Sequence, residues 1–217
     1  MYFGYLRGAE TLYGGGVWQP YRSARSVVVV MQVNGYWIEP RANLAGADLS
    51  GANLAGADLS GARLADANLN NANLESANLS GAWLANARLI EANLEEANLS
   101  RANLNLAVLM DAMLEKANLT GANLIQANLR RAWLAYANFS KADLRAADLT
   151  DSFLCITNFS GADLNGAQLS EQSLNGSDFT GTNLADAILE GASAHGDTIF
   201  PEGFDLEASE IFWDVKF

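Results

Sequence analysis

Large apolar residues recur at every fifth position through the middle of the chain. Leucine occupies 27 of these 30 positions between Leu44 and Leu189, and the other three are Phe139, Phe159 and Phe179. Successive positions would lie about 140° apart around an α-helix, and they would alternate between the two sides of a straight β-strand. All of them can face one side only if the chain changes direction once per repeat. The pattern therefore predicts a chain that winds around its own core.

The residues around these apolar centres support this interpretation. The residue two before the centre is Ala in every repeat from Ala42 to Ala147, and the residue just before it is usually Asn or Asp. A very small residue lets the backbone approach a large neighbour in a tight core, and Asn and Asp favour turns. Glycine is common two residues after the centre, where a turn can require a positive φ.

A second period of twenty residues gives the size of one coil. The residue that follows the centre is a hydroxyl residue at seven positions spaced by twenty: Ser60, Ser80, Ser100, Thr120, Ser140, Ser160 and Thr180. The three phenylalanine centres belong to the same set of repeats. We therefore predict that four repeats form one coil and that residues twenty apart stack, which gives about 7.5 coils.

The tandem A(N/D)LXX motif between residues 42 and 191 resembles the pentapeptide repeat family, and "GYWIEP" before it resembles the lead-in of bacterial, especially cyanobacterial, members. The resemblance implies an all-β fold, a right-handed quadrilateral parallel β-solenoid with the centres and alanines inward. A solenoid exposes apolar side chains and unpaired backbone at its ends, so terminal caps are expected. We predict an N-terminal extension and cap (1–40), a solenoid of 30 repeats (41–193), and a C-terminal cap or tail (194–217).

Both ends leave alternatives open. Residues 1–30 form either a loosely attached extension, with Met31 as an alternative start, or an ordinary cap that uses Val27 to Val30. Ile199 and Phe204 continue the five-residue count, which predicts about half a coil more. The apolar residues of 211–217 either cover the open end or pair with a second copy.

The sequence offers little material for catalysis. The single histidine, His195, lies in the predicted cap, and the single cysteine, Cys155, follows a centre and should face outward. No Cys/His cluster with metal-ligand spacing, phosphate loop or nucleophile elbow is present in the sequence. We expect no enzymatic activity, no metal and no cofactor. We also expect no membrane-spanning segment, no signal peptide and a cytoplasmic location.

Apolar residues in place of the usual Asn or Asp before the centre predict a binding surface. Three of them follow one another at one-coil intervals: Met113, Trp133 and Phe153. The same side is predicted to carry Tyr136, Ile156 and Cys155, and the neighbouring side Val108, Met110 and Ile90. Exposed, stacked aromatic residues are typical of protein-binding surfaces. Alternatively, a terminal segment covers them, or they only stack on one another.

Two functions follow from these features. The first is a rigid scaffold or protein-interaction module whose partner is an unidentified protein, with a possible homodimer through the C-terminal tail. The second is a DNA-mimicking regulator of a type II topoisomerase, as the resemblance to gyrase-protecting family members implies. The net charge of −12 fits the second function in sign. The repeat region, however, carries one net negative charge per about 4.5 Å, against one per about 1.7 Å in B-DNA.

Charged residues also form columns at the twenty-residue spacing. One column contains Glu75, Glu95 and Glu115 with Glu96 beside it, and another contains Glu91, Asp111, Asp151 and Glu171, interrupted by Arg131. Stacked like charges repel, so either a partner relieves them or they form a solvated face. No uninterrupted basic stripe is present, and we therefore expect no direct binding of nucleic acid.

Overall fold

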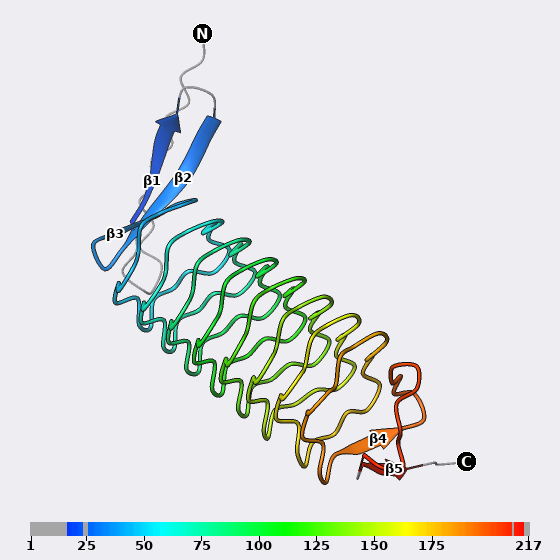
Figure 1. The fold of residues 1–217 in the computed structure, drawn as a ribbon. Helices are drawn as coiled ribbons and strands as arrows, with labels where there is room; N and C mark the ends of the chain where they lie inside the picture. Colours follow the sequence, from blue (N-terminus) through cyan, green and yellow to red (C-terminus); the bar gives the residue numbers. More distant parts are fainter. Residues whose placement is uncertain (1–16, 24–25, 210, 215–217) are drawn as a thin grey trace.

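The repeats form a coil that advances along one axis (Figure 1). The structure, a computed structural model, describes residues 17–23, 26–209 and 211–214. In almost every repeat the residue before the centre forms a parallel bridge with the residue twenty positions further on, beginning with Asn43 to Arg63 and Arg63 to Trp83. The predicted stacking of residues twenty apart is therefore confirmed, and the body of the protein is a β-solenoid. Its right-handed sense and its count of coils stay predictions.

A sharp corner closes every repeat. The amide of Ala47 donates to the carbonyl of Leu44 at 3.0 Å, and the same bond recurs along the coil. The residue two after the centre has a positive φ in every repeat from Arg41 to Gly191. These are the features of a type II turn, which needs a left-handed residue at its third position. Glycine, Asn and Asp adopt this conformation at low cost, which explains their frequency there.

Four walls lie between the corners. We number them by the residue before the centre in the first coil: wall 1 begins at Asn43, wall 2 at Asp48, wall 3 at Asn53 and wall 4 at Asp58. The centres and the small residues point inward and are almost completely buried. Phe139, Phe159 and Phe179 stack behind wall 4, with ring centroids 5.3 and 5.2 Å apart. Equivalent positions thus form continuous columns of side chains.

Polar residues replace alanine in the later coils and remain buried: Ser152, Thr157, Gln172, Ser177 and Thr182. Their side chains bond to backbone or to one another. Thr157 donates to the carbonyl of Leu134 at 2.9 Å, and Ser177 donates to that of Leu154 at 2.6 Å. Each buried hydroxyl that replaces a methyl group therefore has a partner, as burial of a polar group requires.

Three antiparallel strands precede the first coil. The strands β1 (Val17–Ser23), β2 (Ser26–Val33) and β3 (Tyr36–Ile38) pair in sequence order, and β1 and β2 extend away from the solenoid (Figure 1). An Asn-Gly turn with positive φ at both residues joins β2 to β3. Met31, Val33 and Ile38 are buried and continue the core. Residues 1–16, about half of the predicted extension, lie outside the described residues.

The C-terminal end departs from the predicted register. Ile199 pairs with Asp178 on the outside and is 53% exposed, while Phe200 takes the inward position and stacks on Phe179 at 5.6 Å. The turn closed by the amide of Thr198 and the carbonyl of His195 has the usual size, but β4 before it contains one extra residue after the inward Ala194, which shifts the count by one. The prediction from the five-residue count was therefore wrong for Ile199, whereas Phe204 does pack against the core.

A short segment then closes much of this end. Phe204 stacks on Phe200 at 4.8 Å, and Ile211 and Trp213 pack partly buried against the core. Strand β5 (Phe212–Asp214) pairs in parallel with β4 (Ser193–His195). Phe212 points outward and is 71% exposed. The tail thus covers the core with some apolar residues and exposes another, and a homodimer through it stays a prediction. In the described part of the chain, no helix has the length and apolar character to cross a membrane.

We expect the aromatic column behind wall 4 to contribute strongly to stability. Phe159→Ala removes a fully buried ring between two others, so the free energy of unfolding should fall by about 3–5 kcal/mol. Phe153→Ala removes an exposed ring on the outside of wall 3 that contacts Trp133. This change should cost less than about 1 kcal/mol. Urea unfolding followed by circular dichroism measures both values, and equal losses would contradict the burial of the column.

Candidate functional site

Three large apolar side chains follow one another on the outside of wall 3. Met113 pairs with Trp133, and Trp133 pairs with Phe153, in consecutive coils. The rings of Trp133 and Phe153 lie 6.0 Å apart between centroids and are tilted by 46°. About half of each ring residue is exposed, 53% for Trp133 and 51% for Phe153. The structure therefore brings the predicted aromatic residues together on the surface, and no segment that it describes buries them.

Two further apolar residues lie on the corner that follows wall 3. Tyr136 and Ile156 are exposed and occupy the left-handed position of the turn, with φ of 60° and 55°. A β-branched residue in this region is an outlier, because its side chain crowds the backbone. We refer to Met113, Trp133, Tyr136, Phe153 and Ile156 as the aromatic patch. A β-branched residue is more costly at this turn position than Asn, which occupies it at Asn71 and Asn86.

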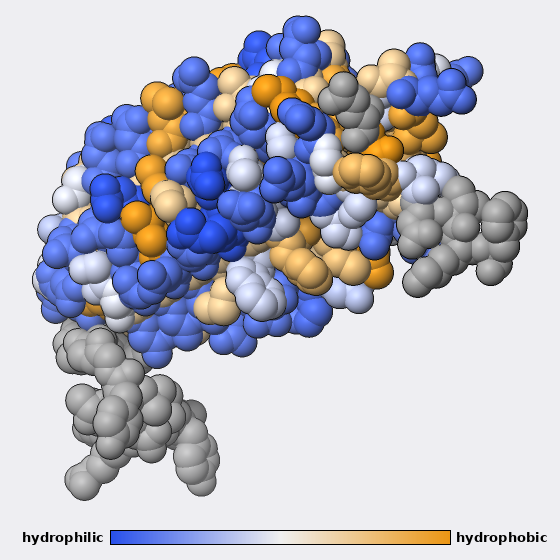
Figure 2. All heavy atoms as spheres, turned by 90° about the horizontal axis from the view of Figure 1, so that it is seen from below, coloured by the Kyte–Doolittle hydropathy of each residue, from blue (hydrophilic) through white to orange (hydrophobic). Residues whose placement is uncertain are grey.

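The other predicted residues lie at the margin of this patch. Val108 is on wall 2, while Met110 and Ile90 lie on the corner between walls 2 and 3, and all three are half-buried. Cys155 is half-buried on the corner beside Ile156. They extend the apolar surface around the corner but expose less of it. In the view of Figure 2, hydrophobic residues likewise form bands within a largely hydrophilic surface.

The patch ends where the backbone ladder of wall 3 is interrupted. Bridges run along this wall up to Phe153 and resume at Ser173 with Ser193, and no bridge joins Phe153 to Ser173 in the described structure. At this level Ser152 donates to the side chain of Gln172 at 3.0 Å, and Gln172 donates to the carbonyl of Leu149. A long polar side chain thus fills a position that holds alanine elsewhere and replaces backbone pairing with side-chain bonds.

Ion pairs between coils neutralise much of the two acidic columns. Arg131 donates to both carboxylate oxygens of Asp111, at 2.7 and 2.6 Å. Lys116 lies 3.1 Å from Glu96 and 3.8 Å from Glu95, and Arg130 lies 3.3 Å from Asp151. These pairs relieve part of the repulsion predicted within the columns. Among the described residues, no ion pair involves Glu75, Glu91, Glu115 or Glu171. These pairs are exposed to solvent, where such pairs contribute little to stability.

The same contacts shift the pKa values of the groups involved. The hydrogen bonds from Arg131 lower the pKa of Asp111, and the hydrogen bond to Glu96 raises the pKa of Lys116. Asp111 and Lys116 are therefore charged at neutral pH. The aromatic patch lies between two corners that each carry both positive and negative side chains.

The single histidine and the single cysteine do not form a catalytic pair in the structure. His195 is at the end of β4, 3.5 Å from Asp197 between Nδ1 and Oδ1, and Cys155 is on the corner after wall 3. No group of three or more His, Cys, Asp or Glu side chains gathers as metal ligands within the described residues.

Comparison with known proteins assigns the repeats to a family. A family model for pentapeptide repeats matches eight copies, within residues 42–81, 72–109, 87–124, 112–151, 122–161 and 157–191. The chain belongs to the pentapeptide repeat family. No curated protein matches the sequence.

Several solved pentapeptide repeat structures are similar to this chain. HetL, involved in heterocyst differentiation regulation in the cyanobacterium Nostoc sp. strain PCC 7120, is 34% identical, with 76% of this chain and 90% of that chain covered and a TM-score of 0.42. A trypsin-treated form of QnrB1, a plasmid-mediated fluoroquinolone resistance protein, is 19% identical, with 80% and 87% covered and a TM-score of 0.52. The likeness to QnrB1 shows the β-solenoid fold alone.

One exposed aromatic residue of this pentapeptide repeat protein was not among those predicted from the sequence. Trp83 also replaces Asn or Asp before a centre, but it lies on wall 1, away from the aromatic patch. It is 61% exposed. The substitution rule that identified Trp133 would have identified Trp83 as well, if it had been applied to every wall.

We expect the strained corner at Ile156 to lower stability. Ile156→Asn places a residue that tolerates positive φ at this corner, so the free energy of unfolding should rise by up to about 1 kcal/mol. Leu106→Asn is the matched control, because Leu106 is also exposed at a positive φ, on a corner outside the patch. Both variants should be more stable in thermal unfolding, and a loss of stability in Ile156→Asn would argue against strain.

Removal of Arg131 should raise the pKa of Asp111. A lowered pKa in the folded state stabilises the protein above the ordinary Asp value of 3.8, and this contribution is lost as the pH falls through the folded value. Arg131→Ala removes both hydrogen bonds and should return the titration of Asp111 toward higher pH. Carbon-13 NMR of the carboxyl group gives both midpoints, and identical midpoints would rule out the pairing in solution.

Proposed function

We propose that this pentapeptide repeat protein is a rigid, non-enzymatic scaffold that binds another protein through the aromatic patch. The observation that carries the proposal is the exposure of Trp133 and Phe153 at positions where the other coils of wall 3 carry mostly polar residues. Exposed rings contribute little to the fold itself. Trp and Tyr are, by contrast, the residues that most often dominate binding energy between proteins.

The backbone under the patch supports a preorganised surface. The amide of Trp133 donates to the carbonyl of Ala112, and the amide of Leu134 donates to that of Phe153, both at 2.9 Å. Leu114, Leu134 and Leu154 are completely buried directly behind the wall. A surface whose backbone is hydrogen-bonded to neighbouring coils and packed against buried leucines loses little conformational entropy when a partner binds.

The surroundings of the patch favour a partner of mixed polarity. Arg131 and Asp111 on one corner and Lys116 and Glu96 on the other form ion pairs at its rim. A rim of paired charges around apolar rings matches the anatomy of ordinary protein interfaces. We infer a partner that packs apolar side chains against the exposed sides of the rings and meets the rim with polar groups.

The regulator of a type II topoisomerase remains the alternative. The fold similarity to QnrB1 is compatible with it, but the paired cations reduce the resemblance of the surface to the dense charge of DNA. We expect no change in gyrase supercoiling when the protein is added at about micromolar concentration. Inhibition or protection from a quinolone in that assay would favour the alternative.

Substitution of both rings should abolish partner binding without unfolding the protein. We expect Trp133→Asn combined with Phe153→Asn to weaken binding by about 100-fold or more, because two central rings are lost. The partner is first captured from an extract of the source organism, then purified and measured by calorimetry. Trp83→Asn, which removes one exposed indole from wall 1, is the control and should bind the partner normally. If the double variant captures the same partner with equal affinity, the patch is not the binding surface.

A further inference from the structure

A groove crosses the outside of wall 1 in the first three coils. It has a volume of about 820 Å³ and lies far along the chain from the aromatic patch. Its lining comes from wall 1 and the corners on either side of it: Arg41, Asn43, Ala45, Gly61, Arg63, Ala65, Gly81 and Trp83. The volume is within the range of small-molecule sites in proteins.

Small residues at the two corners make this surface hollow. A Cβ atom at Gly81 would meet no atom within 4 Å, so the space above it is open. At Gly61 the same atom would lie 3.4 Å from Cγ of Arg41, which shows that the Arg41 side chain reaches along the corner over this glycine. At the opposite corner the side chains of Ala45 and Ala65 are too small to fill the groove. The sequence thus places two cationic side chains and one indole around a floor of small residues.

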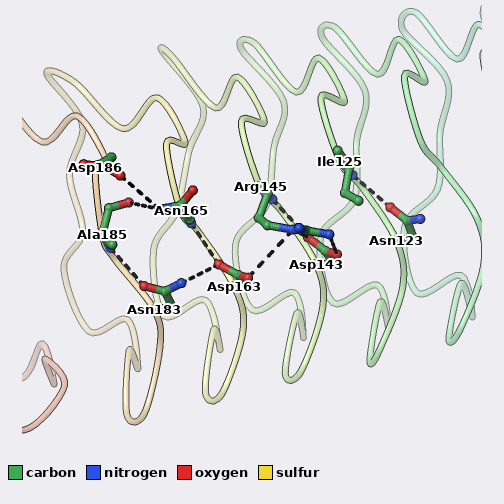
Figure 3. Close-up of polar contacts among 9 residues, drawn as sticks. All are labelled: Asn123, Ile125, Asp143, Arg145, Asp163, Asn165, Asn183, Ala185 and Asp186. Atoms are coloured by element: carbon green, nitrogen blue, oxygen red, sulfur yellow. Dashed lines mark hydrogen bonds and ion pairs between the residues drawn. The ribbon is translucent and has the colours of Figure 1, made fainter.

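The arginines of the groove differ from an arginine further along the same wall. Arg145 donates to both oxygens of Asp143 at 2.8 Å and lies 3.8 Å from Asp163, so its charge is satisfied (Figure 3). Asn183 continues this network by donating to Asp163 at 2.9 Å. No carboxylate lines the groove, and neither Arg41 nor Arg63 forms an ion pair with any described residue. Both are exposed.

Trp83 supplies a flat apolar surface beside these charges. It pairs with Arg63 one coil away, so the indole and the guanidinium group start from neighbouring positions on the same wall. Guanidinium groups bind phosphate oxygens through paired hydrogen bonds, and an exposed indole stacks on flat rings. A single ligand that carries both an oxyanion and a ring would satisfy both groups.

The rest of wall 1 limits the size of such a ligand. After Trp83 the wall continues with Asn103 and Asn123 and then with Asp143 and Asp163. A long polyanion that ran along this wall would meet carboxylates, whereas a ligand of the size of one nucleotide would not. We propose that this groove binds a small phosphate-bearing aromatic compound, of the nucleoside monophosphate class, with its phosphate at Arg41 and Arg63 and its ring on Trp83.

Calorimetry of the full chain with three probes tests this site. Adenosine monophosphate should bind at least about tenfold more tightly than adenosine or inorganic phosphate, because only it engages both the arginines and the indole. A short single-stranded oligothymidylate should bind no more tightly than the mononucleotide. Failure of adenosine monophosphate to bind at about 1 mM, or equal binding of inorganic phosphate, would overturn the proposal. Tighter binding of the oligonucleotide would overturn the limit on size.

Matched variants locate the site. Arg63→Glu, Trp83→Ala and Gly81→Asp should each weaken binding of adenosine monophosphate by at least about tenfold. Arg88→Glu on wall 2 and Gly121→Asp two coils further along the same corner are the controls and should bind normally. Aspartate is tolerated at this kind of corner, as at Asp66 and Asp111. Loss of binding in the controls to the same extent would overturn the assignment.

This inference is independent of the proposed protein interface. The Trp133→Asn and Phe153→Asn double variant should bind adenosine monophosphate like the unmodified protein, and Trp83→Ala should still bind the partner protein. Loss of nucleotide binding in the double variant would place the ligand at the aromatic patch and overturn the groove as its site.

Discussion

The fold depends on one backbone constraint, the left-handed residue at the corner of every repeat. This corner turns the chain after each five residues, so that every centre faces inward and every residue before a centre faces outward. Backbone groups of successive coils then form hydrogen bonds, as the amide of Leu124 does with the carbonyl of Asp143 at 2.7 Å. Since each coil repeats the same corners, side chains of equal position must stack, and a column continues only if its members are compatible with one another.

In most outer columns the stacked side chains form hydrogen bonds or ion pairs with one another. Asn98 donates to Asn78, and Asn118 donates to Asn98, along wall 4. Arg145 and Arg131 bind acids of their own or a neighbouring coil. These polar groups satisfy one another and leave little for a partner to recognise. The aromatic patch and the groove at Trp83 are different. Trp133 and Phe153 contact each other but remain about half exposed, and Arg41 and Arg63 form no ion pair with any described residue. These are the two places at which we propose binding to another molecule.

The acidic columns illustrate why stacking must be evaluated in three dimensions. The sequence places Glu91, Asp111, Asp151 and Glu171 in one column that only Arg131 interrupts, which suggests repulsion between the acids. In the structure Arg131 reaches back to Asp111, and Arg130 reaches forward to Asp151. Long cationic side chains span the distance between coils and pair with two of the four acids, while Glu91 and Glu171 form no ion pair among the described residues. The order of charges along the sequence therefore does not show which acids are paired.

The sequence by itself determined the period, the inward and outward positions, the stacking at twenty residues and the exposure of Trp133 and Phe153. These features follow from local backbone geometry, which each repeat expresses within five residues. Only the tertiary structure decided the register after His195, the pairing of Arg131 with Asp111 and the groove beside Trp83. One extra residue in the strand before a turn leaves no periodic signal, and ion pairs and grooves depend on which way long side chains extend. Those directions are set by neighbours in other coils, not by the repeat itself.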